Sequence, residues 1–331
     1  MTAREAIEFL QNSMNEATIG QERIVERLIM GLLADGNILI EGLPGLAKTR
    51  IVRSMADVIE AKFSRIQFTP DLSPSDVMGQ QRAFEENDKT VFRFYKGSIF
   101  GNIILADEIN RAPAKVQSAM LEAMEERQVT IAGVTHKLPK LFIVMATQNP
   151  IEQEGTFPLS EAQKDRFFMH VTVTYVNMES EFQMIRMIQD ERQHVKVQQS
   201  KIPQELIFAA RKEVSDVKVS DEIGHYIVDL IFSTRYPLRY SRQLDVMIEI
   251  GVSPRGSLAL TQCAQAHAWM NGKSEVDVND VYNVIHDVFR HRLTLTEHAM
   301  RNERSIDDII DIILEQVKQP KIGSGEESIK D

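Results

Sequence analysis

Short apolar runs alternate with helical spacing of apolar residues over the first half of the chain. The runs expected to form strands are 37–41, 63–68, 102–106, 141–146 and 168–174. Apolar residues three or four positions apart predict helices at 3–17, 21–34, 47–60 and 113–126. Alternating strands and helices predict an α/β domain, in which helices cover both faces of a mostly parallel sheet.

Two polar interruptions of this pattern predict β-hairpins. The first, at 80–96, has two short runs around Asn87 and Asp88, and the second, at 128–138, has two runs around Ala132 and Gly133. Asn, Asp and Gly are favoured in tight turns. Hairpins that project from an α/β core are often functional, and surface decoration is the simpler alternative.

After about residue 175 the strand pattern ends and helical spacing continues. The expected helices are 178–189, 203–213, 219–233, 241–250, 255–270, 278–291 and 305–317. We therefore predict four parts, namely a core at 1–175, a connecting helix at 176–200, a small helical domain at 201–320 and a flexible tail at 321–331.

Composition narrows the classes of function. The formal net charge is −10 at pH 7, which argues against a generally basic surface for nucleic acid. The single cysteine, Cys263, lies in an apolar helical pattern and is interpreted as a small core residue. No apolar run is long enough to predict a membrane span, and the first residues lack a secretory signal pattern. We expect a cytoplasmic protein.

The segment Gly42–Thr49 joins an expected strand to an expected helix and has the sequence Gly-Leu-Pro-Gly-Leu-Ala-Lys-Thr. This layout is typical of a phosphate-binding loop, whose backbone N–H groups surround phosphate oxygens. Lys48 would reach the β- and γ-phosphates, and the Thr49 hydroxyl would bind Mg²⁺. The usual motif has glycine where this chain has Ala47, so the match is imperfect.

Two later strands also end in polar residues. Asp107 and Glu108 follow the apolar run 103–106, where Asp107 can hold Mg²⁺ and Glu108 can act as general base on an attacking water. Asn149, after the next strand, could orient that water, although a turn-forming role before Pro150 fits equally well. Ligands bind beyond the carboxyl ends of strands in open α/β sheets, so we expect a shared site.

Together these motifs resemble the AAA+ ATPases and, more narrowly, the MoxR family. The stretches that carry the resemblance are Glu41–Thr49, Thr69–Asp76, Leu105–Pro113, Gln117–Gln128, Ala146–Pro150 and Glu161–Phe167. The resemblance implies a P-loop AAA+ core with a parallel five-stranded sheet of order 5-1-4-3-2 flanked by helices, and a small all-helical lid. It also implies that the two hairpins are the helix-2 insert and the pre-sensor-1 hairpin. Ala47 is then ordinary, because this family commonly carries alanine there.

The resemblance further implies residue roles in binding ATP and Mg²⁺. Asp107 and Glu108 correspond to the Walker B pair, and Asn149 corresponds to sensor 1. The expected ATP-binding residues are Ile19, Gly20, Gly42, Leu43, Pro44, Gly45, Leu46, Ala47, Lys48, Thr49 and Arg50. Thr49 and Asp107 would hold Mg²⁺, largely through water.

Arginines from two regions complete the expected site. Arg166 resembles the finger that a neighbouring subunit supplies to ATP, with Arg111 and Arg127 as alternatives, and Arg255 resembles sensor 2 of the lid. An arginine placed against transition-state charge contributes strongly to nucleotide hydrolysis, but spacing alone selects none of these four.

The resemblance implies an ATP-hydrolysing chaperone that assembles as a ring, usually a hexamer. Its clients would be protein complexes, in some cases with von Willebrand A domains, and its task would be remodelling or metal or cofactor insertion. A nucleic-acid motor of the related helicase clade is the first alternative, disfavoured because the hairpin at 128–138 has no basic cluster with aromatics. A scaffold that only binds ATP is the second, disfavoured by the Asp107-Glu108 pair.

Overall fold

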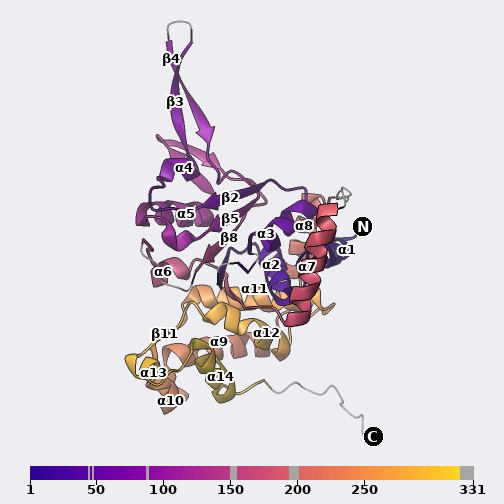
Figure 1. Ribbon diagram of the computed structural model, residues 1–331. Coiled ribbons are helices and arrows are strands. Elements are labelled where there is room, and N and C mark those ends of the chain that lie inside the picture. The colour runs from indigo at the N-terminus through magenta and orange to yellow at the C-terminus, as the bar shows by residue number, and fades with distance from the viewer. Residues whose placement is uncertain (44, 47, 87–88, 150–154, 194–200, 321–331) are drawn as a thin grey trace. The chain divides into compact units, whose positions relative to one another are not determined.

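Two compact units make up the chain in the computed structural model, Met1–Asp216 and Val217–Asp331 (Figure 1). The described residues are 1–43, 45–46, 48–86, 89–149, 155–193 and 201–320. Each unit is described separately below. No helix in these ranges is long and apolar enough to cross a membrane.

A five-stranded parallel sheet forms the centre of the first unit. Its strands, in spatial order, are β2 (Phe63–Gln67), β5 (Ile103–Asp107), β8 (Ile143–Gln148), β1 (Ile38–Gly42) and β9 (Met169–Val173). Numbered by their order in the chain, these strands read 5-1-4-3-2 from β9 to β2, which confirms the predicted sheet. The same register places the carboxyl ends of β1, β5 and β8 at one edge.

Helices of the first unit follow the predicted pattern closely. They are α1 (Ala3–Ala17), α2 (Glu22–Leu33), α3 (Lys48–Val58), α4 (Pro74–Met78), α5 (Ala114–Glu126), α6 (Glu161–Lys164), α7 (Met178–Gln193), α8 (Gln204–Ser215) and the 3₁₀ turn η1 (Ile109–Arg111). The sequence did not predict α4 and α6, because one helical turn carries no periodic signal. Each is started by a serine capping box, at Ser73 and Ser160.

Both faces of the sheet are buried, as expected for a parallel sheet. On one face, Ile104 and Val144 pack in a cluster with Val116 and Met120 of α5. The alternate residues of the same strands, such as Leu105, are also fully buried. Burial on both sides fixes the strands rigidly, and therefore fixes the polar residues at their ends.

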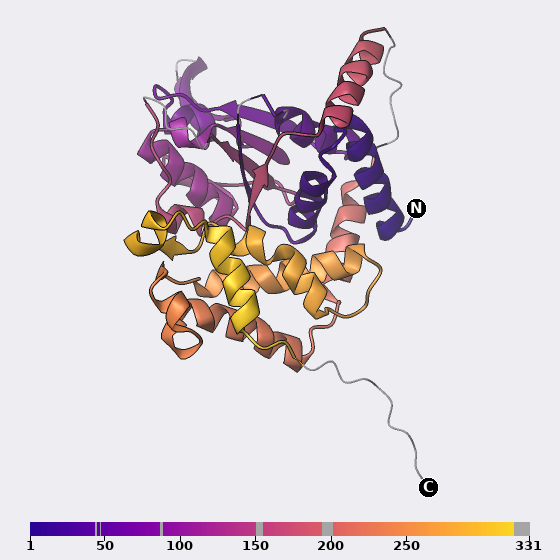
Figure 2. The same cartoon turned by 60° about the horizontal axis from the view of Figure 1, so that its bottom comes forward.

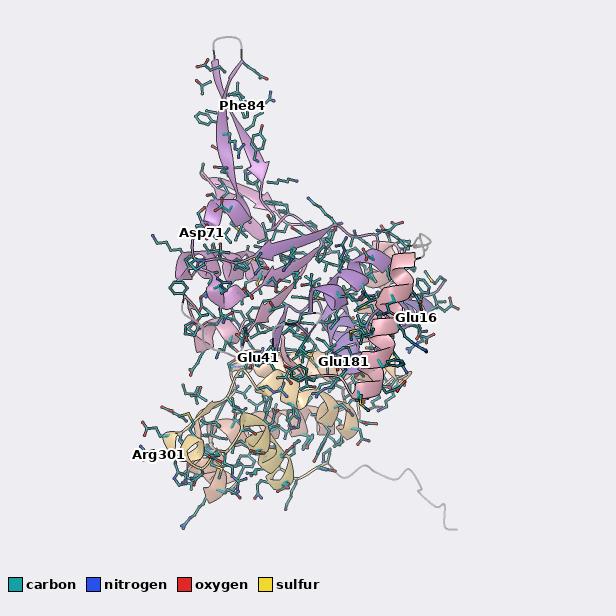
Figure 3. The ribbon with its side chains drawn as sticks, viewed as in Figure 1. Glu16, Glu41, Asp71, Phe84, Glu181 and Arg301 are labelled. Carbon is teal, nitrogen blue, oxygen red and sulfur yellow. The ribbon has the colours of Figure 1, made fainter. Side chains whose placement is uncertain are left out.

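Two hairpins interrupt the α/β pattern at the predicted places. One pairs β3 (Gly79–Glu86) with β4 (Lys89–Lys96) and projects from the sheet, and the other pairs β6 (Gln128–Ile131) with β7 (Val134–Lys137) (Figure 1). Figure 3 labels Phe84 part-way along the projecting hairpin. The rings of Phe94 and His136 stack with centroids 3.9 Å apart, so the hairpins contact each other. The predicted turn at 87–88 lies outside the described residues.

The second unit is mainly helical, and its helices appear in orange to yellow in Figure 2. They are α9 (Asp221–Arg235), α10 (Arg242–Asp245), α11 (Pro254–Met270), α12 (Val278–Phe289), α13 (Glu297–Arg301), α14 (Ile306–Gln316) and the turn η2 (Pro237–Arg239). One buried network joins α11 to α12, where His267 bonds Asp280 at 2.6 Å and Lys273 bonds it at 3.0 Å.

The predicted helix at 241–250 is wrong in its second half, and the second unit is not purely helical. The chain leaves α10 after Asp245 and forms β10 (Ile248–Ile250), which pairs with β11 (Thr294–Leu295). The Thr296 hydroxyl donates to the Val246 carbonyl at 2.7 Å, which favours pairing over helix. A side chain at Gly251 would come within 2.5 Å of the Thr234 carbonyl, so the chain can turn closely there.

Residues 201–216 were predicted to be part of the helical domain, but they belong with the first unit in the structure. Ile202 forms a β-bridge with Ile59. Arg211 of α8 donates to the Leu32 carbonyl at 2.8 Å and pairs with Asp35 at 2.9 Å. These contacts tie α8 to α2 and to the end of α3.

Candidate active site

A cavity of about 330 Å³ lies at the carboxyl ends of the strands in the first unit. The residues that line it are Gly45, Leu46, Lys48, Thr49, Arg65, Asp107, Glu108 and Asn149. The structure therefore brings together seven residues that the sequence selected from three separate segments, namely Gly45, Leu46, Lys48, Thr49, Asp107, Glu108 and Asn149. Arg65 is an addition from β2.

The loop between β1 and α3 supplies positive charge to this cavity. Lys48 donates from Nζ to the Gly42 carbonyl at 2.6 Å, so its ammonium group is held against the loop. Burial lowers the pKa of Lys48 from its ordinary value, and the carboxylates of Asp107 and Glu108 oppose that change. Gly45 has φ of +86° with open space around its Cα, a conformation that suits glycine and exposes backbone to a ligand.

Glu41 immediately precedes this loop, at the end of β1 (Figure 3). His170 of β9 lies 3.2 Å from its carboxylate, and this contact holds the pKa of Glu41 below its ordinary value. The Gln148 side chain donates to the same carboxylate. These contacts join β1, β8 and β9 beneath the loop and fix where it starts.

Asp107 has both of its carboxylate oxygens engaged. Thr147 of β8 donates its hydroxyl to Oδ1 at 2.6 Å, and Arg65 donates from Nη2 and Nε to Oδ2 at 2.5 and 3.1 Å. Asp107 is only 8% exposed. A buried carboxylate needs such partners, so its orientation toward the cavity is set by two neighbouring strands.

Glu108 has a left-handed backbone, with φ of 58° and ψ of 52°. This conformation is uncommon for a residue other than glycine, and it turns the chain sharply after β5. The backbone N–H of Glu108 donates to the Thr147 hydroxyl at 2.9 Å. Gln67 and Arg111 each donate to Oε2 at 3.1 Å. The sharp turn presents the Glu108 carboxylate to the cavity beside Asp107.

Three residues of this network were not predicted as site residues. Arg65 and Gln67 alternate along β2, and both side chains reach the acids at the end of β5. Thr147 lies on β8, the other strand beside β5, and its hydroxyl bonds both Asp107 and the backbone N–H of Glu108. The polar residues of strand 63–68 and Thr147, directly after strand 141–146, were the available signal, but they become informative only when both strands are known to flank Asp107.

The proposed arginine finger does not line the cavity. Arg166 forms an ion pair with Glu125 of α5 at 2.9 Å, with both side chains about one third exposed. Of the alternatives, Arg111 contacts Glu108, while Arg127 bonds the Asp35 carbonyl at 2.9 Å. Arg255 lies in the first turn of α11 in the second unit. The roles of these arginines remain predictions.

Two of the expected ATP-binding residues, Ile19 and Gly20, follow α1 close to where α1 is tied to α3. Arg50 of α3 donates from Nε to the Ala17 carbonyl at 2.8 Å, next to Ile19 and Gly20 in sequence. Gly20 lies directly against Ser180 of α7. Two predicted ATP-binding residues, Pro44 and Ala47, lie outside the described residues.

The donor set fits a magnesium nucleotide. Thr49 offers a hydroxyl and Asp107 a carboxylate, the hard oxygen ligands that Mg²⁺ prefers. Lys48 and the first N–H groups of the 11-residue helix α3 provide positive charge for phosphate oxygens. Both groups border the same cavity, so one ligand can contact them together.

Replacing Thr147 by valine tests the link between the two acids. Valine keeps the shape of threonine, but it leaves a buried Asp107 oxygen and the Glu108 N–H without this partner. We expect the free energy of unfolding to fall by about 1–3 kcal/mol, measured by denaturant titration. Thr147→Ser keeps the hydroxyl and is the matched control. Equal stability of Thr147→Val and the unchanged chain would contradict this interpretation of the contacts.

Comparisons with known proteins point to the same chemistry. The model of the "ATPase family associated with various cellular activities (AAA)" matches residues 37–169, and an AAA lid domain model matches 243–313. Chaperone MoxR1 of Mycobacterium tuberculosis is 42% identical, over 92% of this chain and 80% of that protein. The uncharacterized Bacillus subtilis protein YeaC is 40% identical, over 93% of this chain and 92% of that protein. A crystal structure from Cytophaga hutchinsonii, provisionally described as an ATPase, is 40% identical with a TM-score of 0.88, covering 96% of this chain and 95% of that one.

Proposed function

The chain belongs to the MoxR family of AAA+ ATPases, and we propose that it uses Mg·ATP hydrolysis in a ring to remodel or mature partner protein complexes. ATP hydrolysis is the activity of the family. The observation that carries the assignment to this site is the single cavity shared by Lys48, Thr49, Asp107 and Glu108.

Each side chain in the cavity is suited to one part of hydrolysis. Lys48 and the start of α3 would bind the β- and γ-phosphates. Glu108 would accept a proton from the water that attacks the γ-phosphate, and Asn149 would orient this water. Mg²⁺, held by Thr49 and Asp107, would neutralise phosphate charge. Gln67 and Arg111 fix the Glu108 carboxylate in the present structure.

We further propose that Arg166 acts on the ATP of a neighbouring subunit. Its position supports this role, because Arg166 lies away from its own cavity, is partly exposed and is oriented by Glu125. A finger supplied in trans requires an oligomer, and head-to-tail contacts that close generate rings. A hexamer is the ring size that the family resemblance implies.

Complementation between two inactive variants tests the trans role. Lys48→Ala subunits have weakened nucleotide affinity but keep Arg166, while Arg166→Ala subunits keep the nucleotide site. An arginine finger contributes about 10³-fold or more to turnover. We therefore expect each variant alone to be nearly inactive, and mixed rings to hydrolyse ATP at least about tenfold faster than either. Phosphate release is the measurement.

Arg53→Ala is the matched control for that mixture, because Arg53 is an exposed arginine on α3. It should keep full turnover alone. Absence of recovery in mixtures that size-exclusion chromatography shows to be co-assembled would refute the trans role of Arg166. Recovery in an Arg111→Ala mixture, but not an Arg166→Ala mixture, would transfer the role to Arg111.

We propose that the client is a protein complex, and a subunit with a von Willebrand A domain is one candidate within it. The two hairpins are the surface that we assign to client contact, because the β3–β4 hairpin exposes Phe92 (65%) and Tyr95 (42%). Affinity purification with Glu108→Gln, which should retain ATP, is the experiment that identifies the client. Client recovery should be lost when Phe92 and Tyr95 are both replaced by serine.

A further inference from the structure

Arg65 occupies the carboxylate that is expected to hold the metal. It lies on β2, the edge strand of the sheet, directly opposite Leu105 of β5. Two of its nitrogens donate to Oδ2 of Asp107, at 2.5 and 3.1 Å. The Thr147 hydroxyl holds the other oxygen at 2.6 Å. Arg65 is therefore the partner that a cation at Oδ2 would displace.

The same guanidinium is connected to Glu108 through one side chain. Arg65 donates from Nη2 to Oε1 of Gln67 at 2.7 Å, and Gln67 donates from Nε2 to Oε2 of Glu108 at 3.1 Å. Arg65 and Gln67 are two residues apart on one strand, so their side chains lie on the same face. An uninterrupted set of hydrogen bonds thus runs from Asp107 through Arg65 and Gln67 to Glu108.

We propose that Arg65 is a positioning residue that competes with Mg²⁺ for Asp107, so that metal binding also changes the contact between Arg65 and Gln67. This proposal rests on the proposed function, in which Asp107 holds the metal. Without the metal, Arg65 neutralises Asp107 and keeps Gln67 bonded to Glu108. With Mg²⁺ held at Asp107, Arg65 would leave this carboxylate and its bond to Gln67 would be lost, while Arg111 would still hold the Glu108 carboxylate.

Burial and charge support a mobile arginine and a fixed aspartate. The Arg65 side chain is 47% exposed, whereas that of Asp107 is 11% exposed. Arg65 also borders the cavity, so it has space into which it can move. In its absence Asp107 would present unneutralised charge to a metal-free nucleotide, because Arg111 pairs with Glu108 and only Lys48 of α3 remains as a cation lining the described cavity. Like charges at this distance repel.

Arg65→Met tests the competition by equilibrium binding rather than turnover. A fluorescent ADP analogue is titrated into the full chain, once with MgCl₂ and once with EDTA. For Arg65→Met we expect weaker binding in EDTA and equal or tighter binding in MgCl₂. The Kd in EDTA divided by the Kd in MgCl₂ should be at least about tenfold larger than for the unchanged chain. This size is expected for the loss of one charge-assisted hydrogen-bonded pair.

The controls separate this role from a structural one. Arg65→Lys keeps a charge that can neutralise Asp107, so its ratio should lie nearer to that of the unchanged chain. Arg53→Met removes an exposed arginine of α3 that does not line the cavity, and should leave the ratio unchanged. A fall in affinity by the same factor in MgCl₂ and EDTA would mean that Arg65 contacts the nucleotide or supports the fold, and would overturn the proposal. If the unchanged chain binds no nucleotide, the proposed function itself fails; normal binding with the same ratio in Arg65→Met refutes this proposal alone.

Discussion

Replacing Glu108 by glutamine is expected to lower kcat for ATP hydrolysis by at least about 100-fold, since a general base contributes about 10²–10⁴-fold. Glutamine keeps the size of glutamate and can still accept from Gln67 and Arg111, but it cannot take a proton from water. ATP affinity should therefore be nearly unchanged. Steady-state phosphate release and equilibrium ATP binding, measured on the same protein, test both statements.

Glu122→Gln is the matched control, because Glu122 is an exposed glutamate of α5 outside the cavity. Its turnover should equal that of the unchanged chain. Comparable turnover by Glu108→Gln and Glu122→Gln would remove Glu108 from the role of general base. Loss of ATP binding in Glu108→Gln would instead mean that its carboxylate maintains the shape of the site.

Replacing Lys48 by alanine is expected to weaken ATP binding by about 10- to 100-fold, because a charge-assisted hydrogen bond contributes about 1.5–3 kcal/mol. Lys48 is held by the Gly42 carbonyl with its ammonium group at the cavity wall. Alanine leaves the start of α3 without this charge. Titration with a fluorescent ATP analogue gives the affinity.

Lys115→Ala, at an exposed lysine of α5, is the control for loss of a positive charge at the surface. Thermal unfolding should show that Lys48→Ala retains its fold, because Lys48 contributes no large apolar surface. Unchanged ATP affinity in a folded Lys48→Ala chain would exclude Gly42–Thr49 as the phosphate-binding loop.

The first unit could be predicted well from the sequence because its elements give strong periodic signals. The five apolar runs became β1, β2, β5, β8 and β9, and the helices between them lie within a few residues of their predicted bounds. Strand order is a different matter. Periodicity cannot show which strands are neighbours, and the order 5-1-4-3-2 came from the family resemblance.

The site was predicted only as far as local motifs reach. Lys48, Thr49, Asp107 and Glu108 were found because the strand–loop–helix and strand–acid patterns are local. Arg65 was missed because its partner, Asp107, lies 42 residues away and becomes a neighbour only through β2–β5 pairing. The left-handed turn at Glu108 also has no sequence signal, since glutamate is an unusual residue for it.

The second unit shows how tertiary pairing overrides local pattern. Helical spacing extends to residue 250, yet Ile248 pairs with Leu295 across a distance that no local window includes. Likewise, α8 has ordinary helical spacing, and tertiary contacts such as those with Leu32 and Asp35 place it in the first unit.

Hydrolysis of Mg·ATP in the cavity of the first unit is the central claim, and a single-turnover quench experiment tests it most directly. Each protein is mixed in excess with radiolabelled ATP, and bound ATP and ADP are separated over time. The account predicts that the unchanged chain converts bound ATP to ADP, that Glu108→Gln binds the same ATP and keeps it as ATP, and that Lys48→Ala retains little of either. Conversion by Glu108→Gln at the rate of the unchanged chain would contradict the account.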